Sequence, residues 1–209
     1  MQFTEFILNN NVIGFHEQPI TLRSGKQSHL YVNWRTITND AFLLNQLADY
    51  IIQYINANNI SADCIYGVPE GATKTAIIAS LKLAQSQKYS KGTHIIPMGR
   101  AKPKEHGDIK DKFFIGAPTN NAIVIEDVTT TGNSLIETLD MLKANSITVT
   151  TAITLTDRME NKNLHQQMVQ RNVTFHAMST AAELIPLAIA QQKPSKAIII
   201  AIQKELSIK

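Results

Sequence analysis

Residues 121–134 restrict the fold and the chemistry of this chain more than any other stretch, and they read N-A-I-V-I-E-D-V-T-T-T-G-N-S. The apolar run 122–125 is too short for a helix and is typical of a strand buried on both faces. From Leu135 to Leu142, apolar residues recur at helical spacing. The polar residues between these runs are predicted to form a strand-to-helix turn, with the carboxylates of Glu126 and Asp127 at the end of the strand.

The polar turn has the composition of a phosphate-binding site. Hydroxyl side chains, a glycine and the unpaired N–H groups of a helix N-terminus together form a cradle for an anion. The adjacent carboxylates would repel a phosphate, so their expected partners are ribose hydroxyls, which donate hydrogen bonds to carboxylates. The turn is interpreted as a ribose-5-phosphate site. The alternative is an ordinary βα loop with an acidic strand end and a good N-cap, which explains single Thr or Asp residues but explains the whole array poorly.

The composition favours one cytoplasmic domain that binds a small anion. A chain of 209 residues suffices for one domain with a sizeable core. The formal charge is +3, and the basic residues at 100–112 alternate with acids, so no nucleic-acid-binding arm is expected. The lone Cys64 excludes a disulfide framework and is expected to be a buried strand thiol in a reducing compartment. No apolar run suits a membrane span, and the first residues lack the pattern of a signal peptide.

Strands and helices alternate from about residue 40 onward, which predicts an α/β fold with a mostly parallel sheet flanked by helices. Ligands bind at the carboxyl ends of the strands in such sheets. The predicted strands are 63–66, 94–98, 113–115, 122–125, 148–155 and 173–177. The predicted helices are 3–10, about 39–58, 77–83, the run after residue 134, and two stretches in a C-terminal tail that carries no recognisable site chemistry.

The stretch I-V-I-E-D-V-T-T-T-G-N-S resembles the phosphoribosyl pyrophosphate (PRPP) motif of the type I phosphoribosyltransferases: an apolar strand, two acids, then a phosphate loop of Thr, Gly and Ser. Further segments resemble those of the orotate phosphoribosyltransferase family, in the family's order along the chain. The resemblance implies a single domain over residues 1–209, with an N-terminal hood at 1–35, an α/β core at 36–209 and a lid at 99–112.

Residues 19–35 concentrate arginine, lysine, tyrosine and tryptophan in two short extended runs around a Ser24-Gly25 turn. By themselves they predict a small hairpin. The pattern L-x-S-G-x-x-S, followed by an aromatic residue and an Arg, resembles the hood over the base site in the orotate family. The resemblance implies that Arg23 reaches towards the pyrophosphate and that Tyr31 lies near the base, although His29-Leu30 replace the family's more usual Pro-aromatic pair.

The segment G-V-P-E-G-A-T-K-T-A at 67–76 follows a predicted strand and precedes a predicted helix. It does not satisfy the Walker P-loop pattern, because Ala72-Thr73 stand before Lys74. It resembles the family's loop that meets pyrophosphate through backbone N–H groups, and the resemblance implies that role for Glu70 and Gly71. Lys74 is as well explained by a solvated charge on the helix.

The predicted lid breaks all periodicity and mixes basic and acidic residues with a Pro and a Gly, which by itself indicates a solvated loop. The run R-A-K-P-K-E-H-G resembles the catalytic lid of the orotate family, R-x-x-x-K-[DE]-H-G, and a lid that closes over a substrate excludes water. The resemblance implies that Arg100, Lys104 and His106 clamp the pyrophosphate. Ala101 stands where many members carry a Lys, so either one contact is missing or Lys102 replaces it.

Arg158 follows a predicted strand in the sequence T-D-R-M-E. Taken alone, it is explained equally well as a surface Arg near a helix start. It also matches the D-R position from which the family's Arg reaches the orotate carboxylate, a planar anion that suits a guanidinium fork. The resemblance implies that Thr130 is a second orotate contact.

Together these resemblances imply a magnesium-dependent glycosyltransferase, a pentosyltransferase that joins orotate to PRPP and releases pyrophosphate in pyrimidine biosynthesis. Mg²⁺ would be held mainly through PRPP rather than by a protein metal site. A homodimer is implied, because the family's lid works in the site of the neighbouring subunit. The expected catalytic residues are Lys104, His106, Arg100 and Asp127, the expected orotate contacts are Thr130, Arg158 and Tyr31, and the expected PRPP contacts are Arg23, Glu70, Gly71, Arg100, Lys104, His106, Glu126, Asp127, Val128, Thr129, Thr130, Thr131, Gly132, Asn133 and Ser134.

Two other functions compete with this interpretation. A purine or uracil phosphoribosyltransferase would share the PRPP motif, but a neutral base needs no cation for a carboxylate, so the hood, the lid and Arg158 argue against it. A PRPP-sensing regulator would keep the motif without catalysis. The intact lid and the absence of an added DNA-binding segment argue against that function.

Overall fold

The computed structural model describes residues 2–22, 25–87, 89–106, 112–119, 121–159, 161 and 163–206. Within these ranges, the central sheet has four parallel strands in the order β3-β6-β7-β8. This arrangement confirms the predicted α/β class with a parallel sheet. The bounds are Cys64–Gly67 for β3, Ala122–Thr129 for β6, Val149–Asp157 for β7 and Thr174–Ala177 for β8.

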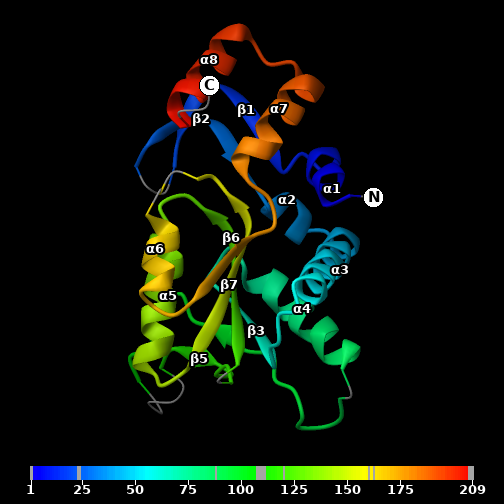
Figure 1. Cartoon of the computed structure of the whole chain (residues 1–209), viewed down its shortest axis with the longest axis vertical. Coiled ribbons are helices and arrows are strands. Elements are labelled where there is room, and N and C mark those ends of the chain that lie inside the picture. Colours follow the sequence, from blue (N-terminus) through cyan, green and yellow to red (C-terminus); the bar gives the residue numbers. More distant parts are fainter. Residues whose placement is uncertain are drawn as a thin grey trace.

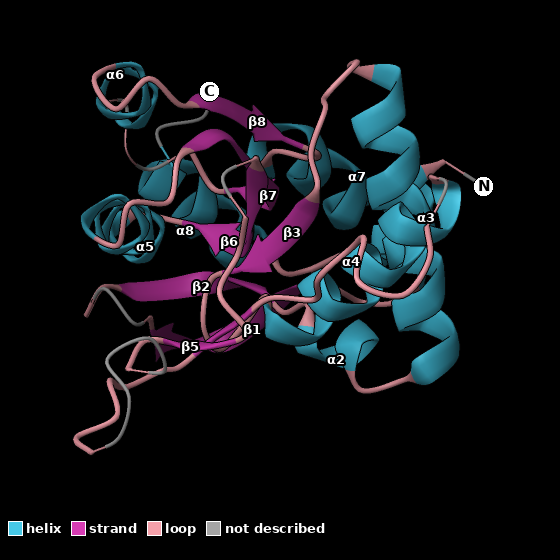
Figure 2. Ribbon diagram, turned by 90° about the horizontal axis from the view of Figure 1, so that it is seen from below, coloured by secondary structure: helices cyan, strands magenta, loops and turns pink. Residues whose placement is uncertain are grey.

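Helices cover both faces of the central sheet, because its strands carry buried apolar side chains on both sides. Ile123 and Ile125 belong to one hydrophobic core, and Val124, which points to the opposite face, belongs to the other. Figures 1 and 2 show α3 and α4 on one side of the strands and α5 and α6 on the other. The bounds are Ala41–Ala57 for α3, Thr73–Ser86 for α4, Asn133–Ala144 for α5 and Leu164–Val169 for α6.

Strand β6 extends further than the sequence pattern predicts. The predicted end at the two carboxylates is wrong, because β7 continues to pair with β6 beyond them. Glu126 lies opposite Thr154 in the register, and Thr129 lies opposite Asp157. Both carboxylates therefore belong to a paired strand, whose backbone holds them more firmly than a turn would.

The longest predicted helix is confirmed with its start at Asp40. The Asp40 side chain accepts a hydrogen bond of 2.8 Å from the backbone N–H of Leu43 and so caps α3. A short helix, α2 (Arg35–Thr38), precedes it. Even α3, at 17 residues, is short for a bilayer, and none of the helices in the described ranges is both long and apolar enough to cross a membrane.

The strand predicted at 94–98 is wrong for its first four residues. Only Met98–Gly99 forms a strand, β4, which pairs antiparallel with β5 (Phe114–Ile115). Pro97 has no N–H to donate to a ladder, and the side chain of His94 bonds Gln87 instead, with 2.9 Å between Nε2 and Oε1. The two short strands form the stem from which the predicted lid leaves the sheet.

The two ends of the chain pack together beside the central sheet. Strands β1 (Ile13–Thr21) and β2 (Gln27–Val32) form the predicted antiparallel hairpin, although Ser24 of its turn lies outside the described residues. Helix α8 (Lys196–Leu206) contacts both strands of this hairpin. Figure 1 shows α7 (Ala181–Gln192) and α8 at the same end of the molecule as the hairpin, with α1 (Phe3–Asn9) nearby.

Candidate active site

A cleft of about 600 Å³ lies at the carboxyl ends of β3, β6 and β7. This is the edge where parallel sheets bind their ligands. The hairpin β1–β2 forms one wall, and the loop after β3, the start of the predicted lid and the end of β6 form the others. The lining residues are Thr21, Leu22, Tyr31, Val32, Asn33, Trp34, Arg35, Pro69, Glu70, Gly71, Ala101, Lys102, Glu126, Asp127, Val128, Thr130, Ser134 and Arg158.

The acidic pair of β6 lines the middle of the cleft. Glu126 is buried, with 6% of its surface exposed, and Asp127 is half-buried. The Asp127 carboxylate accepts a 2.9 Å hydrogen bond from the N–H of Val128 and lies against Gly71. A Cβ at residue 71 would stand 2.5 Å from Asp127 Oδ2, so only glycine lets the loop after β3 approach this carboxylate so closely.

The phosphate loop, residues 129–134, encloses a second cavity of about 290 Å³ that adjoins the cleft. Glu126, Val128, Thr130 and Ser134 line both cavities, so the two are continuous along β6. Helix α5 begins behind this loop, and no side chain among the described residues caps its start. The first N–H groups of a helix have no intrahelical partner, so the amides of α5 are available to an anion in this cavity.

Gly132 gives the phosphate loop its turn into α5. Its φ is +80°, a left-handed conformation that favours glycine. A Cβ at this position would also lie 2.5 Å from Cδ1 of Leu164, on α6. The close packing of α6 therefore requires a residue without a side chain at this point of the loop.

Polar contacts from the segment after β7 hold the phosphate loop in shape. The buried Thr129 hydroxyl donates a 3.0 Å hydrogen bond to Asp157, whose Oδ1 also accepts from the N–H of Met159 at 2.8 Å. Asn161 Nδ2 donates to the carbonyl of Thr131 at 2.7 Å. Asp157 and Asn161 support the loop, and the sequence did not reveal them, because nothing in a linear pattern pairs them with a loop 28 to 30 residues earlier.

The base end of the cleft, which we define as Tyr31, Trp34 and Arg158, lies between the hairpin and the end of β7. Tyr31 is half-buried with its ring 5.9 Å from that of His16. Trp34 is buried, and its Nε1 donates a 3.1 Å hydrogen bond to Thr156 Oγ1. Two flat aromatic surfaces and a guanidinium thus share one wall of the cleft.

Arg158 is buried, with 2% of its surface exposed, so the alternative of a surface arginine is wrong. Its guanidinium donates to the carbonyl of Leu30 at 3.2 Å, to Ser28 Oγ at 3.1 Å and to Glu205 Oε1 at 2.7 Å. Glu205 lies on α8, in the tail where the sequence indicated no site chemistry. No periodicity or motif reveals this contact, since the two residues meet only in the folded chain.

The predicted cations divide between the cleft and the exterior. Lys102 and the adjacent Ala101 line the cleft, whereas Lys104 and His106 are exposed and lie outside its lining. The N–H of Arg100 bonds the carbonyl of Phe113 at the base of the lid. Arg23, expected to reach the pyrophosphate, lies outside the described residues, as does Gly107 of the lid motif.

Two further basic residues lie in different environments. Arg35, the first residue of α2, lines the cleft, and only the local density of basic and aromatic residues at 19–35 could have indicated it. Lys74 faces away from the cleft, because its Nζ donates to Asn39 Oδ1 at 2.9 Å. The interpretation of Lys74 as a charge outside the site is confirmed.

Burial raises the pKa of two groups on β3. Cys64 is buried at the start of this strand, which confirms the predicted buried strand cysteine, and burial raises the pKa of its thiol. Burial also raises the pKa of Tyr66 to about 12. The Tyr66 hydroxyl occupies the space into which a Cβ of Gly99 would project, so β3 and the lid stem approach closely at this glycine.

The donors of the cleft suit Mg²⁺ that arrives with a phosphorylated ligand. No group of three or more His, Cys, Asp or Glu residues able to hold a metal occurs among the described residues. Glu70, Glu126 and Asp127 nevertheless bring carboxylate oxygens to one cleft. Mg²⁺ prefers oxygen ligands and is commonly bound by one or two carboxylates together with substrate phosphates. These residues therefore fit the ion as part of a metal–phosphate complex.

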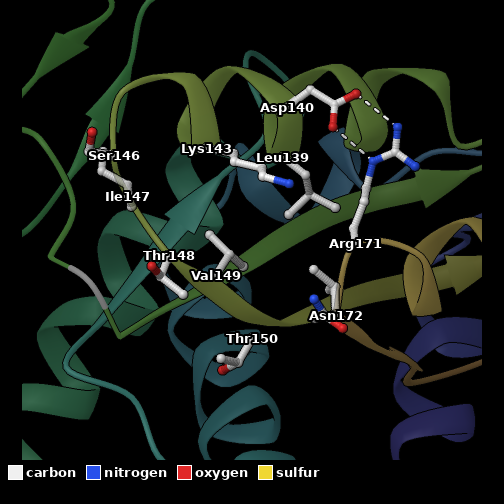
Figure 3. A pocket seen from close by; sticks show the side chains of 11 residues that line it. Leu139, Asp140, Lys143, Ser146, Ile147, Thr148, Val149, Thr150, Arg171 and Asn172 are labelled. Carbon is white, nitrogen blue, oxygen red and sulfur yellow. Dashed lines mark hydrogen bonds and ion pairs between the residues drawn. The ribbon is translucent and has the colours of Figure 1, made fainter.

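A third cavity, of about 300 Å³, lies at the opposite, amino-terminal ends of β7 and β8. Figure 3 shows its floor of apolar side chains and, at its rim, the ion pair between Arg171 and Asp140. Both guanidinium–carboxylate bonds are 2.8 Å long. The Arg171 hydrogen bond lowers the pKa of Asp140, and the same bond raises the pKa of Arg171. The guanidinium and the carboxylate neutralise each other, so we interpret this ion pair as a structural contact.

Comparison with known proteins agrees with this geometry. The chain is 33% identical over 164 residues to orotate phosphoribosyltransferase of Methanococcus maripaludis, a match that covers 78% of this chain and 83% of the relative. It is 31% identical over 175 residues to uridine 5'-monophosphate synthase of Bos taurus, covering 82% of this chain but only 34% of that protein. The structure of orotate phosphoribosyltransferase from Francisella tularensis superposes with a TM-score of 0.66 at 24% identity, over 97% of this chain and 96% of that one. No family model matches.

The parallel sheet, the acidic pair of β6 and the uncapped phosphate loop behind it define a type I phosphoribosyltransferase. Within that class, the chain belongs to the orotate phosphoribosyltransferase family. The chain spans about a third of the bovine synthase, so the comparison with that protein concerns only its corresponding part.

Proposed function

We propose that the protein transfers the ribose 5-phosphate of PRPP to orotate and forms orotidine 5'-monophosphate and pyrophosphate, a step of UMP synthesis in the cytoplasm. The observation that carries this proposal is that the acidic pair and the phosphate loop open into the same cleft as Tyr31 and Arg158. A ribose phosphate and a carboxylated base would thus meet in one cavity. Membership of the orotate family supports the same reaction.

PRPP would lie along β6 with its 5'-phosphate in the phosphate loop. The backbone N–H groups at the start of α5 and the half-buried hydroxyls of Thr130, Thr131 and Ser134 would bind the phosphate oxygens. Glu126 and Asp127 would accept hydrogen bonds from the ribose hydroxyls. Glu70 and Gly71, which line the cleft beside Asp127, would meet the pyrophosphate. Binding energy from the remote phosphate would hold the reacting carbon in place.

The reaction breaks the bond between C1' of the ribose and the pyrophosphate oxygen, and the electron pair leaves with pyrophosphate. A bond then forms between C1' and the ring nitrogen of orotate, which loses its proton. Positive charge develops on the ribosyl ring, where the carboxylates of Glu126 and Asp127 stabilise it. Negative charge develops on pyrophosphate, where cationic groups are required.

Mg²⁺ would supply part of that positive charge when it is bound with PRPP. Among the chain's own residues, Lys102 lines the cleft and Arg100, Lys104 and His106 lie on the lid. We infer a homodimer in which each lid reaches the cleft of the other subunit, because Lys104 and His106 lie outside the cleft of their own chain. Residues 1–35 would form the hood and residues 36–209 the core of one domain.

Mixing two inactive variants tests the exchange of lids. Lys104→Ala removes a lid cation, and Asp127→Asn removes a charge from the cleft, so each homodimer should turn over poorly. If lids act in trans, a mixture dissociated and reassembled should regain activity, because some dimers then contain one complete site. A mixture as inactive as its parents would contradict the trans arrangement, and co-expressed wild-type chains provide the control for reassembly.

Turnover with orotate and PRPP, followed by the absorbance change of the pyrimidine, tests the proposed reaction. We expect product with orotate and Mg²⁺ and little with uracil or purine bases, because Arg158 offers a cation that only a carboxylated base uses. Product with uracil or a purine instead would reassign the base. Binding of PRPP without turnover of any base would indicate a regulator.

A further inference from the structure

A carboxylate of the protein itself contacts Arg158 at the base end. Glu205, near the end of α8, accepts a hydrogen bond from Arg158 with 2.7 Å between Oε1 and the guanidinium nitrogen. The Arg158 side chain is 1% exposed and that of Glu205 is 15% exposed. The contact is therefore a nearly buried ion pair at the wall of the cleft, and not a surface salt bridge.

The fold brings Glu205 to this position through the packing of α8 on the hairpin. The same hairpin supplies Ser28 Oγ and the carbonyl of Leu30, which also accept hydrogen bonds from the Arg158 guanidinium. Ser28 and Leu30 are neutral, so Glu205 carries the negative charge in this set of contacts. A guanidinium stays protonated at all ordinary pH, and a buried charge needs a partner of opposite sign.

We propose that Glu205 determines specificity at the base end, by competing with the carboxylate of the base for Arg158. This inference rests on the proposed function, in which Arg158 binds that carboxylate. An incoming carboxylate would bring a second negative charge to a guanidinium that Glu205 has already balanced. Two carboxylates close together in a poorly solvated site repel each other, so Glu205 weakens the binding of a carboxylated ligand.

Competition of this kind acts on one class of ligand only. A pyrimidine nucleotide without the carboxylate brings no second charge to Arg158, and Glu205 leaves its binding unchanged. Arg158 creates a preference for orotate derivatives, and Glu205 would lower that preference. Glu205 would also ease the release of the carboxylated product. Because Glu205 acts through Arg158, it is a positioning residue.

Orotidine 5'-monophosphate and UMP form a matched pair of probes, because they differ only in the carboxylate. Their dissociation constants should be measured by calorimetry for the wild-type protein, Glu205→Gln and Glu17→Gln. Gln keeps an oxygen acceptor of the same reach but removes the charge. Glu17 is an exposed residue of β1 outside the cleft lining, so its variant controls for the loss of one surface charge.

In Glu205→Gln we expect orotidine 5'-monophosphate to bind about fivefold tighter, from the removal of one like charge, while UMP binds as in the wild type. Glu17→Gln should change neither constant. Unchanged or weaker binding of orotidine 5'-monophosphate in Glu205→Gln would overturn the proposal. Equal changes for both nucleotides would also overturn it, because they indicate a merely structural role for Glu205.

Thermal unfolding in the presence of each nucleotide tests the same proposal if Glu205→Gln is too unstable for calorimetry. Glu205→Gln removes the negative charge that Glu205 holds beside Arg158, so orotidine 5'-monophosphate should raise the Tm of the variant more than that of the wild type. An equal rise in both proteins contradicts the inference. A wild-type protein that does not prefer orotidine 5'-monophosphate to UMP would instead refute the proposed function, so the two failures are distinguishable.

Discussion

The two ends of the cleft are built in different ways. The ribose-phosphate end comes from one continuous stretch, β6 and the phosphate loop, and its acidic pair and loop residues are neighbours in the chain. The base end joins distant segments, because Arg158 contacts residues 128 and 130 positions earlier and Glu205 47 positions later. The first end is a local motif, and the second exists only when the hairpin and α8 pack beside the sheet.

This difference predicts how each end responds to substitution. Asp127, Thr130 and Ser134 at the ribose-phosphate end are half-buried and line the cleft, so changes at these residues should alter catalysis more than stability. Arg158 is buried and bonds two other elements, so changes at the base end should alter both.

The largest effect is expected for Asp127→Asn. The variant keeps an oxygen that can accept from Val128 N–H but loses the charge that stabilises a cationic ribosyl ring. We expect kcat/KM for PRPP to fall about 100-fold, with an unchanged Tm. Steady-state kinetics and thermal unfolding measure the two quantities. Asp140→Asn, at the far edge of the sheet, is the matched control, and equal activity in both variants would remove Asp127 from the mechanism.

Gly71→Ala should have the next largest effect. The new Cβ would stand 2.5 Å from Asp127 Oδ2, so the carboxylate or the loop after β3 must shift. Displacing a reacting group by about 1 Å can lower a rate about 100-fold, and we expect a loss of about tenfold or more in kcat/KM for PRPP. Gly14→Ala, where a Cβ meets nothing within 4 Å, is the control. Wild-type kinetics in Gly71→Ala would mean that this close approach has no functional role.

Arg158→Lys should separate the two ends of the cleft. Lys keeps the charge but loses the fork that reaches Ser28, Leu30 and Glu205 together. We expect KM for orotate to rise about tenfold, KM for PRPP to stay constant, and the free energy of unfolding to fall by about 1–3 kcal/mol. Denaturant unfolding and kinetics with each substrate varied provide the measurements.

Arg171→Lys, at the exposed pair of Figure 3, is the matched control for Arg158→Lys and should leave both KM values unchanged. A rise in KM for PRPP as large as the rise for orotate would contradict the division of the cleft into two ends. An unchanged free energy of unfolding in Arg158→Lys would contradict the structural role assigned to Arg158.

The smallest effect is expected at Asp140. Arg171 holds the pKa of Asp140 below its ordinary value of 3.8, so the ionised carboxylate stabilises the folded state above that pH. This contribution should disappear as pH falls below about 4 through the lowered folded pKa. The pair is largely exposed, so we expect only about 0.2–1 kcal/mol. Unfolding free energies of the wild type and Asp140→Asn, measured between pH 3 and 7, should converge at the acid end, and a constant gap would contradict this assignment.

Part of the fold followed directly from the sequence because it depends on short-range patterns. Apolar runs predicted the strands of the parallel sheet, and helical spacing predicted α3 and α5. The order of the acids, the hydroxyl residues and Gly132 predicted the turn between β6 and α5. The errors arose where contacts with distant residues decide the structure. Pairing with β7 extends β6 beyond its predicted end. The short helix α6 was not predicted, because its only buried residues, Leu164 and Met168, are too few to show helical spacing.

The class of fold and the strand, turn and helix start of the ribose-phosphate end could be predicted, since neighbouring residues encode them. Three features depend on how distant segments pack: Gly71 lies against Asp127, Arg35 and Lys102 line the cleft, and Glu205 pairs with Arg158. The physical reason is that a buried charge is stabilised by whichever opposite charge the packed chain brings within hydrogen-bonding distance, and sequence separation does not limit that choice.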